Sequence, residues 1–123
     1  LILERKDPLG AFAGTGHTLG AEVSRIVLET IFFKNAPLHD GATIITGNTV
    51  SAAGAILPLS ESSDLPSQFG LRHRAAAGIS ERTDAVAITV SEETGNMHIF
   101  YNGTFEKLTA NTLEKKIQEV LAG

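Results

Sequence analysis

Residues 85–108 read AVAITVSEETGNMHIFYNGTFEKL, and this stretch decides the fold that we expect. It contains three short runs rich in β-branched and aromatic residues, separated by turn signals at Thr94-Gly95-Asn96 and Asn102-Gly103. The runs span 85–90, 97–101 and 104–108. Such runs predict strands, and Asn102-Gly103 is typical of a type I′ hairpin turn. The sequence therefore predicts three consecutive strands joined by tight turns.

A second hairpin is predicted upstream of this stretch. Residues 42–46 are short, apolar and β-branched, and Gly47-Asn48 separates them from a second run at 49–56. Pro58 ends that run, and residues 60–67 carry the strongest loop signal in the chain. A cut-short strand is also expected at residues 1–3.

Three segments predict helices. Apolar residues recur at steps of three and four within 21–33 and again within 112–121, which is typical of amphipathic helices. The Ala-rich segment 72–79 favours a short helix, and Gly78 is expected to weaken its far end. Residues 10–20 are rich in Gly and predict a flexible connection before the first helix.

The alternation of helices and hairpins predicts an α/β (mixed α+β) fold, with a mixed parallel and antiparallel central sheet flanked by helices. No linker, repeat or low-complexity tract divides the 123 residues, so we expect a single globular domain spanning 1–123. The first residue is Leu1 rather than Met, which predicts a piece of a longer protein that lacks its N-terminal region.

The composition excludes several classes of site. The chain has no Cys, so disulfides, thiolate metal sites and Cys nucleophiles are excluded. Its formal net charge is −4, which argues against a sequence-blind nucleic-acid binder because that function needs a strongly positive surface. No apolar run approaches the length of a transmembrane helix, so no membrane contact is expected from this piece.

The first candidate site is Pro-Leu-His-Asp-Gly-Ala at 37–42, before a predicted strand. Asp40 is suited to a hard divalent cation or to polarising a hydroxyl, and His39 beside it to ligation or proton relay. Gly41 would let a ligand approach the backbone closely. The alternative is an ordinary Asp-Gly turn before a strand.

The second candidate is Arg72-His73-Arg74, at the start of a predicted helix. Two guanidinium groups there, together with the helix N-terminus, can bind phosphate oxygens. The alternative is a solvated basic face.

The third candidate is Ser-Glu-Glu-Thr-Gly at 91–95, after the most apolar strand, with a polar hairpin tip as its alternative. Each motif alone is explained better by ordinary structure. Together they provide an acidic metal position, a twin-arginine clamp and polar strand ends, which is the set that phosphoryl or nucleotidyl transfer requires.

Five motifs in this order and spacing resemble the catalytic domain of bacterial diadenylate cyclases, the DisA-N or DAC family. The likeness covers nearly the whole chain and is greatest to the membrane-anchored CdaA-type branch, in which this domain follows N-terminal transmembrane helices. The motifs are PLHDGA at 37–42, LPLS at 57–60, RHRAA at 72–76, GISE at 78–81 and VSEETG at 90–95.

The resemblance implies that two ATP molecules condense into cyclic di-3′,5′-AMP with release of two pyrophosphates. It implies a divalent metal, Mg²⁺ or Mn²⁺, with Asp40 and His39 as its ligands, and a catalytic role for Asp40, Arg72, His73 and Arg74. The implied ATP-binding positions are Gly41, Ala42, Leu57, Leu71, Arg72, Ser91 and Glu93.

The same resemblance implies a face-to-face homodimer, because each product molecule needs two nucleotides whose 3′-hydroxyls face each other's α-phosphates. It implies a cytoplasmic domain, held at the cytoplasmic face of the cell membrane where the longer protein carries an N-terminal anchor. ATP is then the substrate partner and cyclic di-AMP the product, with no nucleic-acid partner.

Two positions depart from the family pattern. Leu71 stands where many relatives have a Thr that can reach phosphate, and Ile56 stands where relatives often have a Tyr against the base. We expect weaker nucleotide binding or an altered contact, not loss of the reaction. The alternatives are a domain that binds or senses adenine nucleotide or cyclic di-AMP without making it, and a metal-dependent phosphoesterase with the same residue types.

Overall fold

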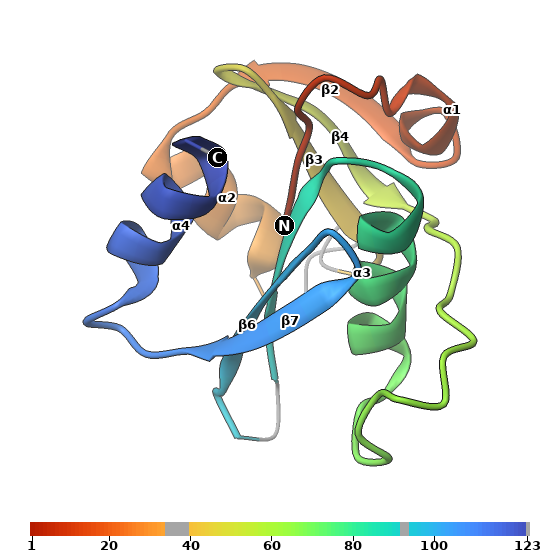
Figure 1. Ribbon diagram of the computed structural model, residues 1–123. Helices are drawn as coiled ribbons and strands as arrows, with labels where there is room; N and C mark the ends of the chain where they lie inside the picture. Colours follow the sequence, from red (N-terminus) through yellow and green to blue (C-terminus); the bar gives the residue numbers. More distant parts are fainter. Residues whose placement is uncertain (34–39, 92–93, 123) are drawn as a thin grey trace.

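A computed structural model describes residues 1–33, 40–91 and 94–122 of the chain. Within these residues, seven strands form one mixed sheet in the order β2-β4-β3-β1-β5-β6-β7, and four helices flank it (Figure 1). The strands are β1 (Ile2–Leu3), β2 (His17–Glu22), β3 (Ala42–Thr46), β4 (Thr49–Ala55), β5 (Val86–Val90), β6 (Met97–Tyr101) and β7 (Thr104–Leu108). The helices are α1 (Gly10–Ala13), α2 (Arg25–Phe32), α3 (Leu71–Arg82) and α4 (Leu113–Ala122). The predicted α/β fold with a mixed central sheet is confirmed.

Strand directions bring three chain segments to one end of the sheet. The short strand β1 pairs in parallel with β3 and antiparallel with β5, while β3 and β4 are antiparallel. The start of β3, the end of β4 and the end of β5 therefore lie at the same end. These are the positions at which the first and third candidate motifs and the segment after β4 occur.

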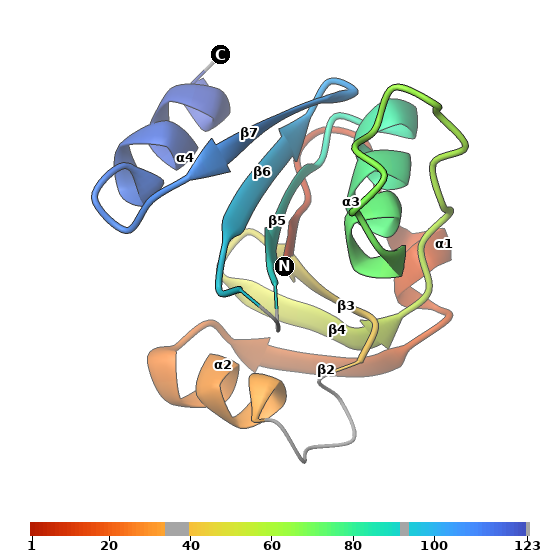
Figure 2. The same ribbon diagram turned by 90° about the horizontal axis from the view of Figure 1, so that it is seen from below.

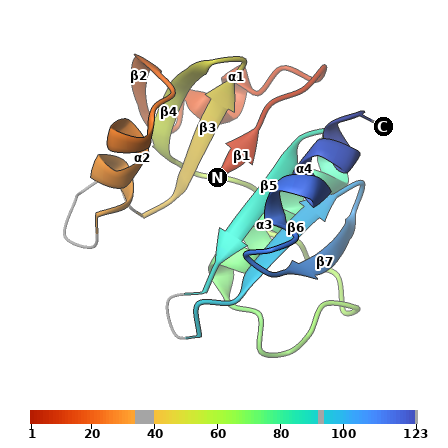
Figure 3. The same cartoon turned by 90° about the vertical axis from the view of Figure 1, so that its left-hand side faces the viewer.

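The helices cover both faces of the sheet. Helices α1 and α3 lie on one face, and α2 and α4 lie on the other (Figure 2). Residues of α1 and α3 share one hydrophobic core cluster, whereas α2 packs on β3 and β4, and α4 packs on β5, β6 and β7 (Figure 3). The alternation of side chains explains the division, because Ile44 belongs to the α3 cluster and its neighbour Ile45 to the α2 cluster.

Both predicted hairpins are confirmed. Strands β3 and β4 pair across Gly47-Asn48, and β5, β6 and β7 pair in sequence. Asn102 and Gly103 have φ angles of 51° and 74°. Two successive positive φ angles are what a type I′ turn requires, so the Asn-Gly signal predicted this turn correctly.

The prediction for residues 10–33 is partly wrong. Residues 17–22 form strand β2, which pairs with β4, so the second half of the expected flexible connection and the first two residues of the expected helix belong to the sheet. The start of that connection, residues 10–13, forms the short helix α1. Helix α2 begins only at Arg25, where the Ser24 side chain accepts a hydrogen bond from the Val27 N–H. Strand β2 contains a register shift between Thr18 and Ala21, and this irregularity hides the alternation that marks a strand.

Helix α3 is longer than predicted and passes through Gly78. A Cβ atom at Gly78 would lie 1.9 Å from the Pro58 carbonyl oxygen, so the segment after β4 packs directly on the helix backbone. Gly78 therefore permits a close approach and does not weaken the helix end. Among the residues that the structure describes, no helix is both long and apolar enough to cross a lipid bilayer.

Candidate functional site

The start of β3 is held tightly against the end of β4. Gly41 has a φ of 81°, and a Cβ there would lie 2.8 Å from the Gly54 carbonyl carbon. Ala42 pairs with Ala55 across the two strands. Both the positive φ and the close approach require Gly at position 41, and they fix the backbone that presents the exposed Asp40.

The segment after β4 is fixed by the Gly-rich stretch near α1. The Thr15 hydroxyl accepts a hydrogen bond of 2.8 Å from the Ile56 N–H and lies 3.4 Å from the Ile56 carbonyl oxygen. A Cβ at Gly16 would lie 2.5 Å from the Ala53 carbonyl oxygen, so this turn sits directly on β4. Leu57 follows as a buried residue of the α3 core cluster. No sequence motif predicts this role of Thr15, because it depends on a contact between segments that are distant in the chain.

The first turn of α3 carries the twin arginines. Nη1 of Arg72 donates a hydrogen bond of 3.1 Å to the carbonyl oxygen of Val90, at the end of β5. Nη1 of Arg74 lies 3.4 and 3.5 Å from the carbonyl oxygens of Ser60 and Ser62. The two guanidinium groups therefore diverge, Arg72 toward β5 and Arg74 toward the loop that leads into α3.

That loop is joined to α3 at several points. The Ser60 N–H donates to the Arg74 carbonyl oxygen at 2.9 Å, and the buried Ser60 hydroxyl donates to the Glu81 carboxylate at 2.7 Å. Together with the Pro58 contact on Gly78, these bonds make residues 58–60 and α3 one packed unit.

His73 lies between the two arginines but faces a cluster of aromatic rings. Its ring stacks on Phe69, with centroids 4.4 Å apart and planes 13° apart, and meets His98 edge-on at 5.5 Å. Burial lowers the pKa of His73, and the neighbouring His98 and Arg72 lower it further. The neutral ring is therefore the stable form of His73, and its stacking is typical of a packing residue.

The third candidate motif is only partly described. The Ser91 hydroxyl accepts a hydrogen bond of 3.3 Å from the Thr94 N–H, and the Ser91 N–H donates to the Asn96 carbonyl oxygen. These bonds are typical of a hairpin tip. Ser91 directly follows Val90, whose carbonyl oxygen Arg72 contacts. Glu93 lies outside the described residues, as does His39 of the first motif.

The predicted site residues thus fall into two groups at one end of the sheet. Asp40, Gly41 and Ala42 lie beside the β4 end that leads to Leu57, while the start of α3 contacts the end of β5 next to Ser91. Leu71, in the same first turn, is 72% exposed. Figure 2 looks toward the start of α3 and the end of β5.

A hard cation at this end would need ligands in addition to the exposed Asp40 carboxylate. Within 1–33, 40–91 and 94–122, no group of three or more His, Asp or Glu side chains is placed to hold a metal ion by itself. Mg²⁺ is usually bound by one or two carboxylates together with waters and substrate phosphates, so a single exposed carboxylate such as Asp40 is compatible with it.

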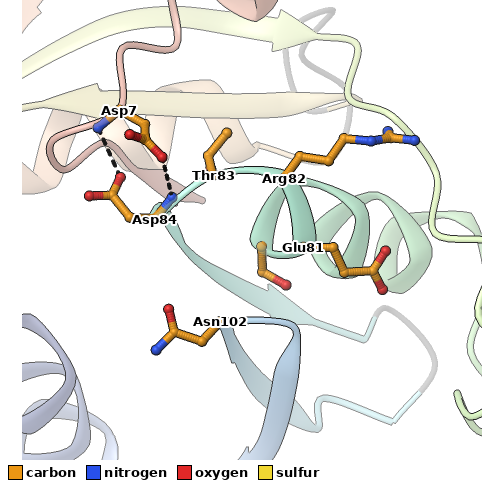
Figure 4. A pocket seen from close by; sticks show the side chains of 7 residues that line it. Asp7, Glu81, Arg82, Thr83, Asp84 and Asn102 are labelled. Carbon is orange, nitrogen blue, oxygen red and sulfur yellow. Dashed lines mark hydrogen bonds between the residues drawn. The ribbon is translucent and has the colours of Figure 1, made fainter.

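A pocket of about 450 Å³ lies at the opposite end of α3 (Figure 4). It is lined by Asp7, residues 80–84 and Asn102. The two aspartates bind backbone groups: Asp84 accepts from the N–H groups of Lys6 and Asp7, and Asp7 accepts from the Asp84 N–H. These bonds join the N-terminal loop to the α3–β5 connection, while the third carboxylate of the lining, Glu81, accepts from the Ser60 hydroxyl.

Comparison with known proteins agrees with the motifs. A family model described as DisA bacterial checkpoint controller nucleotide-binding, abbreviated DAC, matches residues 1–105. The chain belongs to the DAC family. The resemblance inferred from the five motifs is therefore confirmed.

Relatives of this DAC domain include the cyclic di-AMP synthase CdaA of Bacillus subtilis, which is 45% identical over 119 residues. A diadenylate cyclase of Listeria monocytogenes is 46% identical over 121 residues. The matches cover 96% and 98% of this chain but 44% and 43% of the relatives, so the chain spans less than half of their length.

Solved structures share the fold of this DAC domain. A double mutant of DacA from Staphylococcus aureus matches with a TM-score of 0.94 and 37% identity, covering 99% of this chain and 82% of that one. A protein from Bacillus cereus described as a hypothetical membrane spanning protein matches with a TM-score of 0.84 and 42% identity, covering 88% of this chain and 53% of that one.

Proposed function

We propose that this DAC domain is the catalytic domain of a diadenylate cyclase that condenses two ATP molecules into cyclic di-AMP. The observation that carries the proposal is that Asp40, the segment that leads to Leu57 and the first turn of α3 all lie at one end of the sheet. The relatives named as cyclic di-AMP synthase and diadenylate cyclase cover nearly all of the chain and support the same assignment.

The reaction joins each ribose 3′-oxygen to the α-phosphorus of the other ATP and breaks the bond from that phosphorus to pyrophosphate. We assign Arg72 and Arg74 to the triphosphate, because guanidinium groups stabilise charge that develops on the phosphates and the departing pyrophosphate. Gly41, Ala42 and Leu57 are assigned to the adenine side, with Ser91 and Glu93 near the nucleotide at the end of β5.

Asp40 is assigned to the attacking 3′-hydroxyl, where a carboxylate favours loss of the proton. Asp40 and His39 would also hold a divalent cation, Mg²⁺ or Mn²⁺, which when bound helps to deprotonate the hydroxyl and to neutralise the phosphates. His73 lies between the two arginines, and its ring packs against Phe69. We therefore assign it an indirect catalytic role, in which it holds the turn that carries the arginines.

The decisive experiment is incubation of the protein with ATP and Mg²⁺ or Mn²⁺, followed by identification of the product. We expect cyclic di-AMP and pyrophosphate from the wild type, and Asp40→Asn should lower the rate by about 100-fold or more. Asp64→Asn is the matched control, because Asp64 is an exposed carboxylate in the loop before α3. Absence of product from the wild type with either metal would overturn the assignment, and nucleotide hydrolysis without condensation would indicate a phosphoesterase.

We also propose that two copies of the domain pair face to face, each with one ATP. Three large apolar side chains near the candidate site are exposed to solvent: Leu71 is 72%, Ile56 70% and Val90 48% exposed. Their exposure supports burial by a nucleotide or a second copy at this end. Specific activity should rise with protein concentration until pairing saturates, and a constant specific activity would contradict the dimer.

A domain that binds nucleotide without turnover is the second candidate function. It is favoured by Leu71, whose exposed side chain offers no hydrogen-bond donor at the start of α3. Calorimetry that shows tight ATP binding, with no cyclic di-AMP formed over hours, would select this alternative.

A further inference from the structure

The start of α3 has no side-chain cap. Gly70 occupies the N-cap position and makes no side-chain hydrogen bond, and the first turn contains no acidic residue. Capping side chains normally fix the first turn of a helix and satisfy its N–H groups. Two arginines in such a turn need another source of order if they are to bind phosphates with good geometry.

The aromatic cluster supplies that order. Phe69, directly before the cap, stacks on His73 in the first turn, which resembles the apolar contact that staples many helix starts. His98, from β6, meets both rings edge-on, with its centroid 5.1 Å from that of Phe69 and 5.5 Å from that of His73. The start of α3 is thus held from two sides, by its own preceding residue and by the sheet.

The position of His98 in this cluster is energetically unfavourable for one of its ring nitrogens. Its Nδ1 atom is buried and has no hydrogen-bond partner among the described residues. Burial lowers the pKa of His98, and Lys107, which lies opposite it on β7, lowers the pKa further. Since this buried nitrogen makes no hydrogen bond with the described residues, we attribute the contribution of His98 to the flat shape of its ring against His73.

We propose that His98 and Phe69 are positioning residues that hold the His73 ring and thereby orient Arg72 and Arg74 toward the triphosphate. This inference rests on the proposed function, since it presumes that the arginines bind ATP. The side chains of the first turn diverge, so a tilt of the unheld turn would displace both guanidinium groups while leaving the Leu57 segment in place.

The test compares binding of adenosine with binding of α,β-methylene ATP, whose bridging carbon prevents release of pyrophosphate. His98→Ala should weaken binding of the ATP analogue about tenfold, because charge-assisted contacts to phosphate depend on geometry, and should leave adenosine binding within about twofold. His98→Phe restores a flat ring without the buried nitrogen and should bind the analogue within about twofold of the wild type.

Phe105→Leu is the matched control. The centroid of the Phe105 ring lies 5.2 Å from that of Phe69 and 6.3 Å from that of His98, so its loss loosens the same cluster. It should lower the melting temperature without changing the ratio of the two affinities. If His98→Ala does not fold, Phe69→Leu provides the same test by removing the stacked ring and keeping aliphatic volume.

Three results would overturn the positioning role: an unchanged ratio in His98→Ala or in the substitute Phe69→Leu, an equal loss of adenosine binding, or the same loss of selectivity in Phe105→Leu. Failure of His98→Phe to restore binding would also contradict a role based on ring shape. The wild-type product assay is independent, because absence of cyclic di-AMP overturns the proposed function whatever the binding ratios show.

Discussion

The two ends of α3 are built in different ways. The C-terminal half packs directly on Pro58 through Gly78, and hydrogen bonds at Ser60–Glu81 and Asp7–Asp84 lie around its end. The N-terminal turn has no side-chain cap, carries two arginines and an exposed Leu71, and is ordered by stacked rings. One end satisfies its polar groups within the chain, whereas the other presents charge at the candidate site.

The difference indicates how one helix can serve both stability and binding. The bonds of Arg74 to Ser60 and Ser62, at 3.4 and 3.5 Å, are longer than the 2.7 Å bond between Ser60 and Glu81. Long bonds to neutral carbonyls are readily exchanged for shorter ones to phosphate. Changes at the C-terminal end should therefore affect folding, and changes at the N-terminal end should affect binding.

The largest expected effect on stability is that of Gly78→Ala. The added Cβ would lie 1.9 Å from a carbonyl oxygen, so the helix and residues 58–60 must separate. We expect a loss of about 2–4 kcal/mol in the free energy of unfolding, measured by chemical denaturation. Gly70→Ala at the other end meets open space and should cost about 1 kcal/mol or less. Equal losses at the two positions would remove the contrast between the ends.

Asp84→Asn should have a smaller effect, limited to the C-terminal end. Desolvation raises the pKa of Asp84, but hydrogen bonds from the Asp7 and Lys6 backbone, with the nearby Arg5, lower it overall. Because the pKa of Asp84 is lower in the folded than in the unfolded protein, the ionised carboxylate stabilises the fold at pH values above its unfolded-state pKa, near 4. This stabilisation is lost as the pH falls through the folded-state pKa. Because these bonds are exposed to solvent and screened, we expect a cost of about 0.5 kcal/mol at pH 7 that shrinks below pH 4. A difference in melting temperature that does not change with pH would contradict this account.

The smallest expected effect is an acid sensitivity of the N-terminal turn. The pKa values of His73 and His98 are both lowered, chiefly by burial, with His98 and Arg72 acting on His73 and Lys107 acting on His98. Neutral rings therefore stabilise the fold fully above about pH 6.5, and this contribution is lost as the pH falls toward the folded-state values. The melting temperature should decline more gently between pH 7 and 5 in His98→Phe than in the wild type. A parallel decline would show that the ring does not titrate as described.

Local signals in the sequence predicted much of the fold. The hairpin at Asn102-Gly103 and the run 42–56 were predictable because turn chemistry and β-branched residues act over a few positions. Strand β2 was missed because its register shift and Gly20, with a φ of 67°, break the alternation. The prediction that Gly78 weakens the helix was wrong because Gly78 allows the close contact with Pro58, and helix propensity takes no account of tertiary contacts.

The candidate site was predictable at the level of motifs but not of contacts. Arg72 and Asp40 were identified from residue types and order, and the structure places them at one end of the sheet. The sequence could not predict the roles of Thr15, Phe69 and His98, because each depends on a partner that only folding brings close, such as Ile56 for Thr15.

The bonds between Ser60 and α3 have a consequence for nucleotide selection. Because Ser60 is joined to both Arg74 and Glu81, the segment that begins at Leu57 is held against α3 at two points. In the proposed site, these bonds set the spacing between the base and phosphate subsites while the stacked Phe69 and His73 rings hold the first turn of the helix. In that site, we expect a nucleotide whose base and phosphates are separated by the correct length to engage both subsites, and a shorter one to engage only one of them.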